Sequence, residues 1–145
     1  MKPASIFTDF LADLGVPHTR KYSDECFDHM TFRSLFGFSK LLESYGIPNE
    51  ALSLPDKKAD IGQIPVPFLA GMNDSFVIVR QTAPNFVVID DGTGAGEHSI
   101  PIDSFIDRWS GVVLVAYPSQ YSAEPSYCRH HLIDTAAKAK RVILD

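Results

Sequence analysis

The stretch from Phe32 to Tyr45 constrains the fold of this chain more than any other segment, because it is apolar on almost every side. Its large apolar side chains recur at helical spacing, and Gly46 follows as a residue suited to end a helix in the left-handed conformation. A helix that is apolar nearly all round has to be buried. We therefore expect this helix at the centre of the fold, covered by the remaining elements.

A second helix is predicted close to the N-terminus. Ser5 or Thr8 is suited to begin it and Gly15 to end it. The apolar residues between them fall on one helical face: Ile6, Phe10, Leu11 and Leu14.

Beyond Gly46 the apolar period changes from that of a helix to that of a strand. Short apolar runs bounded by Gly, Asn, Asp or Pro predict strands over 51–54, 66–70, 75–79, 86–90, 98–102 and 111–117. Short helical segments are expected over 57–61 and 103–109. Because helices come first and closely spaced strands follow, the order predicts an α+β fold with antiparallel neighbours rather than alternating βαβ units.

The composition changes after Pro118. The acidic excess that gives the chain its net charge of −5 is confined to the part before Tyr121. We expect a domain over residues 1–118 and a helix-prone linker arm over 119–145, with a helix over 131–140. A basic cluster, Lys138 to Arg141, precedes three apolar residues. It is typical either of the cytoplasmic flank of a membrane helix or of a helix C-terminus with favourable charges.

Charge and hydropathy exclude several classes of protein. An acidic chain with a pI near 5.4 lacks the basic surface of a nucleic-acid-binding protein, so no nucleic-acid partner is expected. No run of about 18 apolar residues is present to span a membrane, and the N-terminus does not resemble a signal peptide. Two cysteines are too few for a disulfide framework, which favours a cytosolic location.

Local motifs predict no metal and no cofactor. Cys128 precedes two histidines but has no partner pair at zinc spacing. Asp24, Glu25 and Asp28 lack the spacing of a calcium-binding loop and favour a solvated acidic loop. The glycine-rich residues 92–96 match no phosphate-binding motif and favour a turn. Carboxylates around Cys26 are expected to raise the pKa of its thiol and leave it inert.

The order of several segments carries more information than any of them alone. They are Phe32 to Gly46, Ile64-Pro65-Val66-Pro67-Phe68-Leu69-Ala70, Ser75-Phe76-Val77-Ile78-Val79, Val88-Ile89-Asp90-Asp91-Gly92-Thr93-Gly94, Phe105 and Trp109-Ser110-Gly111-Val112-Val113-Leu114. This series resembles the bacteriocin-processing cysteine peptidases, papain-like domains that remove double-glycine leaders at the N-terminus of export ABC transporters. The resemblance covers residues 31–118 and implies a papain-like fold with buried N-terminal helices packed on an antiparallel sheet.

The resemblance also locates the family's catalytic positions. Arg33 stands where the family has its nucleophilic cysteine, Ser75 where it has histidine, and Phe27 where it has the oxyanion-hole glutamine. Asp90 alone matches the family's residue. Without thiolate and imidazole there is neither nucleophile nor base, which predicts an inactive peptidase-like domain. We expect Arg33 either to pair with Asp90 and plug the former active site or to reach solvent.

A narrower resemblance concerns the context of the domain. Val16-Pro17-His18-Thr19, Leu35-Phe36-Gly37, Pro67-Phe68-Leu69-Ala70, Trp109-Ser110-Gly111-Val112-Val113 and Glu124-Pro125-Ser126-Tyr127 look like the N-terminal domain of certain bacterial membrane proteins. In those proteins the domain precedes a vitamin K epoxide reductase-like bundle and a thioredoxin-like domain. The resemblance implies a soluble domain at the inner face of the membrane, tethered through its C-terminus to a longer protein.

These resemblances imply a peptide-binding or regulatory module of a membrane transport or redox protein. Its partner would be a peptide or leader segment, or its own membrane domain. One alternative is an active cysteine peptidase of double-glycine leaders, with Cys26 as nucleophile, His29 or His98 as base and Asp90 as orienting residue. Another is a redox module in which Cys26 or Cys128 exchanges disulfides with a thioredoxin-like domain.

Overall fold

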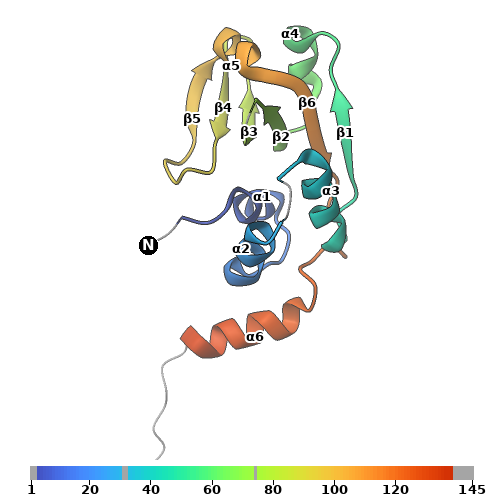
Figure 1. Ribbon diagram of the computed structural model, residues 1–145, viewed down its shortest axis with the longest axis vertical. Helices are drawn as coiled ribbons and strands as arrows, with labels where there is room; N and C mark the ends of the chain where they lie inside the picture. The colour runs from blue at the N-terminus through green and yellow to red at the C-terminus, as the bar shows by residue number, and fades with distance from the viewer. Residues whose placement is uncertain (1–2, 31–32, 74, 139–145) are drawn as a thin grey trace, which may run out of the picture.

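The computed structural model describes residues 3–30, 33–73 and 75–138. Helices near the N-terminus gather against one side of a sheet, and the C-terminal helix lies beyond them (Figure 1). In chain order the helical segments are α1 (Ile6–Leu14), α2 (Arg20–Asp28), α3 (Leu35–Ser44), α4 (Lys57–Asp60), the 3₁₀ segment η1 (Ile61–Gln63), α5 (Ile102–Arg108) and α6 (Tyr127–Lys138).

The strands form one six-stranded antiparallel sheet in the spatial order β1-β6-β2-β3-β4-β5. Their bounds are β1 (Asn49–Ser53), β2 (Phe68–Met72), β3 (Phe76–Thr82), β4 (Phe86–Asp90), β5 (His98–Pro101) and β6 (Trp109–Ala116). Because β6 lies between the first two strands, the sheet is complete only when the last strand has joined it. Helices first and antiparallel strands afterwards confirm the predicted α+β fold.

Helix α1 begins and ends where the sequence predicts. The Ser5 hydroxyl accepts a hydrogen bond from the backbone N–H of Thr8 at 3.2 Å and caps the N-terminus. Gly15 ends the helix with φ at 72°, a conformation that a side chain would strain. The buried face of α1 supplies Phe7, Phe10 and Leu11 to the core.

Helix α2 occupies the segment for which the sequence favoured a solvated acidic loop, so that prediction is wrong. Ser23 and Phe27 are buried on one face of the helix, while Glu25 and Asp28 are exposed on the other. Its first turn receives support from outside the segment, since the Glu124 side chain accepts a hydrogen bond from the backbone N–H of Thr19 at 2.8 Å. A partner so distant in the chain leaves no local signal.

Helix α3 begins at Leu35, with the Ser34 hydroxyl accepting a hydrogen bond from Gly37. Its predicted start at Phe32 lies outside the described residues. Phe38 and Leu42 are buried, but Phe36 is 72% exposed, so the helix is not buried on all sides as its composition suggested. The helix packs against α1 and the sheet with one face only, and the other face meets solvent.

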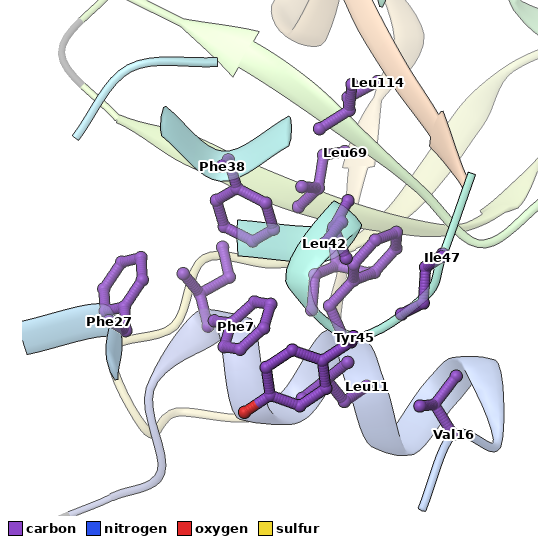
Figure 2. Packing of buried hydrophobic residues seen from close by; sticks show 13 residues of the cluster. Phe7, Leu11, Val16, Phe27, Phe38, Leu42, Tyr45, Ile47, Leu69 and Leu114 are labelled. Carbon is purple, nitrogen blue, oxygen red and sulfur yellow. The ribbon is translucent and has the colours of Figure 1, made fainter. Parts of the chain in front are cut away.

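The sheet separates two apolar clusters. The first lies between α1, α2, α3 and one face of the sheet, with Phe38 and Leu42 near its middle (Figure 2). The second covers the other face and includes Phe105 and Trp109, whose rings stack at 5.4 Å. Alternate residues of β2 supply the two clusters, as expected for a sheet buried on both sides.

The chain after Pro118 returns to the helices before α6 begins. Ala123 donates a backbone hydrogen bond to Tyr45, and Glu124 donates one to Pro17, both at 2.9 Å. The first residues of the predicted arm therefore pack on the domain, while the division at residue 118 stays a prediction. Lys140 and Arg141 of the basic cluster lie outside the described residues. No described helix is long and apolar enough to cross a bilayer.

Candidate functional site

A cleft of about 380 Å³ opens where the N-terminal segment, α2, the start of α3, and the loops before β3 and after β4 meet. Three of the four predicted site positions line it: Phe27, Arg33 and Ser75. The fourth, Asp90, does not, and its neighbour Asp91 lines the cleft instead. The structure thus brings together positions that are far apart in the sequence.

Arg33 lies at the cleft and faces α2. Its guanidinium carbon is 4.6 Å from the centre of the Phe27 ring, and Nη2 is 3.7 Å from Oδ1 of Asp28. The Arg33 side chain is 56% exposed. An exposed cation on an aromatic ring and an exposed ion pair each contribute at most about 1 kcal/mol. Arg33 therefore lies over the cleft wall without being held there strongly.

Asp90 is buried and bound to a different arginine, so the predicted Arg33–Asp90 ion pair is wrong. Its Oδ2 is 3.1 Å from Nη1 of Arg80, and its Oδ1 accepts a hydrogen bond from the backbone N–H of Gly92 at 2.9 Å. Arg80 also donates from Nε to Asp13 of α1 at 2.7 Å. Arg80 lies on β3, the strand next to Asp90, and can therefore contact Asp90 within the sheet. Its second contact, with Asp13, connects helix α1 to the sheet.

Asp24 fastens the N-terminal segment to the cleft wall. Its Oδ1 accepts hydrogen bonds from the Thr8 hydroxyl at 2.6 Å and from the backbone N–H of Ser5 at 2.9 Å. Burial alone would raise the pKa of Asp24, but these hydrogen bonds to the charged form outweigh it and lower the pKa below its ordinary value. A charged Asp24 therefore holds this wall of the cleft at neutral pH.

Cys26 does not line the cleft, although it lies on the same helix as Phe27. Its thiol is half-buried near Tyr22 and Tyr45, and burial raises its pKa, with Glu124 and Glu25 adding to the effect. Carboxylates were predicted to raise this pKa, but the main cause is burial. The thiol is thus less nucleophilic at neutral pH than an exposed one.

Sequence reasoning missed the most buried carboxylate in the described part of the chain. The Glu124 side chain is fully buried and accepts hydrogen bonds from Thr19 and from the Ser23 hydroxyl at 3.1 Å. Nδ1 of His130 lies 2.8 Å from its Oε2, and Tyr45 bonds Ser23 at 2.7 Å. In the sequence, Glu124 stood out only as part of the Glu124-Pro125-Ser126-Tyr127 motif, which did not indicate that it is buried.

Within residues 3–30, 33–73 and 75–138, no group of three or more His, Cys, Asp or Glu side chains is arranged to hold a metal ion. The cleft instead offers apolar and polar side chains together, among them the ring of Phe27, the hydroxyl of Ser75 and the carboxylate of Asp91. Such a lining is suited to binding an organic ligand by contact and hydrogen bonding.

A comparison with protein-family models identifies one family. The model of the peptidase C39 family matches residues 28–121, well over half of the chain. No curated protein matches this chain. The peptidase domain of Streptococcus ComA, a bifunctional ABC transporter involved in a quorum-sensing pathway, is similar with a TM-score of 0.66 at 13% identity. That match covers 79% of this chain and 88% of that one.

Two further solved structures show the same fold. A double-glycine-motif protease from an AMS/PCAT transporter, in complex with the leader peptide, gives a TM-score of 0.66 at 16% identity, covering 82% of this chain and 88% of that one. The peptidase C39-like domain of a toxin-secretion ATP-binding protein from Vibrio parahaemolyticus gives a TM-score of 0.61 at 13% identity. This match covers 82% of this chain and 99% of that one. At these identities the likeness establishes the fold.

Proposed function

Because this chain belongs to the peptidase C39 family, we propose that it uses its cleft to hold an extended peptide without cleaving it. The observation that carries this proposal is the open cleft of about 380 Å³ lined by Phe27, Arg33 and Ser75. These are the positions at which the family's glutamine, cysteine and histidine are expected. A cleft at these positions whose side chains differ from the expected ones supports binding without cleavage.

The lining residues offer no route to thiol proteolysis. A cysteine peptidase needs a thiolate within hydrogen-bond reach of an imidazole, and no described residue lining this cleft is a cysteine or a histidine. His98 lines an adjoining cavity together with Ser75, but no hydrogen bond joins their side chains in the described part of the chain, and Asp90 is engaged by Arg80. The alternative that uses Cys26 has less support, since this thiol lies outside the cleft and has a raised pKa.

A peptide is the occupant that the family and the lining support. One similar structure is a double-glycine-motif protease in complex with its leader peptide. A cleft of this volume falls within the usual range for ligand sites. Phe27 and Phe76 give it apolar surface, while Ser75 and Asp91 can hydrogen-bond to a peptide backbone.

The location of the domain and the type of protein it belongs to are also proposals. We place it at the cytoplasmic face of a membrane, as a module of a transport or redox protein. The peptide would be a leader or a segment of that protein. The similarity to peptidase domains of an ABC transporter and of a toxin-secretion protein supports a transport role. The resemblance to the front domain of vitamin K epoxide reductase fusion proteins supports a redox role.

Filling the cleft is expected to weaken peptide binding strongly. Ser75 is exposed and lines the cleft, so Ser75→Trp places a large ring where the peptide would lie. We expect a fluorescein-labelled double-glycine leader peptide to bind the wild-type protein saturably in an anisotropy titration, and the variant at least about tenfold more weakly.

The matched control is Ser104→Trp, which places the same side chain on an exposed position of α5 outside the cleft. This variant should bind the peptide as the wild-type protein does. The proposal fails if the wild-type protein shows no saturable binding, or if both variants bind as tightly as it does.

A further inference from the structure

A second cavity adjoins the cleft. It has a volume of about 300 Å³ and lies between β2, β4, the start of β5 and the end of α5. Ser75 and Asp91 line both cavities, so the two meet at these residues. Phe76 lines the first cavity and Val77 the second, so the cavities lie on opposite faces of the sheet. A ligand that occupies both therefore passes over the end of the sheet, where Ser75 precedes β3 and Asp91 follows β4.

The two cavities differ in charge. In the first, the carboxylates of Asp24, Asp28 and Asp91 outnumber the single guanidinium of Arg33, which is already paired with Asp28. Among the described residues that line the second, Arg108 is the one permanent cation and Asp91 the one carboxylate.

Arg108 is available to a ligand. It lies in the last turn of α5, is exposed, and forms no ion pair with any carboxylate of the described residues. Asp91 is engaged elsewhere: the Thr93 hydroxyl donates to it at 2.7 Å and is the main cause that lowers its pKa, with nearby His98 contributing. The guanidinium therefore lines the cavity with no described carboxylate paired to it.

We propose that the peptide held in the cleft continues past Ser75 and Asp91 into the second cavity, where it places an acidic residue against Arg108. The proposal rests on the proposed function and names the class of peptide that the site selects. The carboxylates of the first cavity repel an acidic residue, and Arg108 attracts it. The peptide is thereby bound in one register, with its acidic residue on one side of the cleft.

Four labelled peptides test this proposal. Each has ten residues, blocked ends and a central Gly-Gly, with two aspartates or two lysines placed on either the N-terminal or the C-terminal side. On the side that reaches Arg108, we expect the aspartate peptide to bind about threefold or more tightly than its lysine counterpart. Arg108→Glu should reverse that preference, and Arg108→Ala should remove it.

The control variant is Arg129→Glu, which makes the same charge change at an exposed position of α6 outside both cavities. It should leave the preference unchanged. If the peptides bind but neither Arg108 variant alters their order of affinity on either side, the inference is wrong and the proposed function stands. If none of the four binds, the proposed function fails and the inference with it.

Discussion

Replacing Phe38 by alanine is expected to lower the free energy of unfolding by about 3–5 kcal/mol, since a fully buried ring is removed and a cavity is left. The ring lies at the centre of the cluster between the helices and the sheet (Figure 2). Its edge-to-face contacts join it to Phe7 at 5.5 Å, Phe76 at 5.8 Å and Phe27 at 6.1 Å. Urea unfolding followed by the fluorescence of buried Trp109 measures the change.

Phe36→Ala is the matched control, because Phe36 lies two residues away on the same helix and is 72% exposed. We expect it to change the free energy of unfolding by no more than about 0.5 kcal/mol. Equal losses for the two variants would contradict the packing described here.

Phe27 and Phe76 also line the cleft, so the Phe38 ring supports two parts of the cleft wall from behind.

Glu124→Ala is expected to lower the free energy of unfolding by about 3–5 kcal/mol, which is the usual range for removing one partner of a buried charged pair. The substitution leaves the Thr19 N–H and the Ser23 hydroxyl without their acceptor, and His130 without its partner. It also removes the side-chain contacts between the segment before α6 and the start of α2, while the backbone hydrogen bonds of Ala123 and Glu124 remain. Glu124→Gln, which keeps the shape and part of the hydrogen bonding, should cost less.

Glu43→Ala makes the same change at an exposed position of α3, where the carboxylate forms a surface ion pair with Lys40. This variant should stay within about 0.5 kcal/mol of the wild-type free energy of unfolding. Thermal and urea unfolding of the three variants measure these differences. A Glu124→Ala protein as stable as the Glu43→Ala protein would show that the buried network does not stabilise the fold.

Those elements whose signals are local could be predicted from the sequence. Ser5 and Gly15 mark both ends of α1, and β4 spans the predicted residues 86–90. Helix α2 could not be predicted, because Glu124 completes its first turn from 105 residues away. The exposure of Phe36 could not be predicted either. Composition shows that the helix is apolar, but tertiary packing decides which of its faces is covered.

The candidate site was predicted in part. The order of motifs placed Phe27, Arg33 and Ser75, and the structure brings these three to one cleft. The predicted partner of Asp90 was wrong because Arg80, two residues beyond the residue that pairs with Asp90 in the β3–β4 register, lies closer to it. Neither the openness of the cleft nor its junction with the second cavity is encoded in any local pattern.

The most direct test of the central claim is to incubate the protein under reducing conditions with a panel of double-glycine leader peptides and to follow them by mass spectrometry. The Cys26→Ala variant is measured alongside. We expect every peptide to remain intact with both proteins, at concentrations at which the anisotropy titration shows the wild-type protein to be saturated. Cleavage after the double glycine by the wild-type protein, lost in Cys26→Ala, would contradict the account and make Cys26 the nucleophile of an active peptidase.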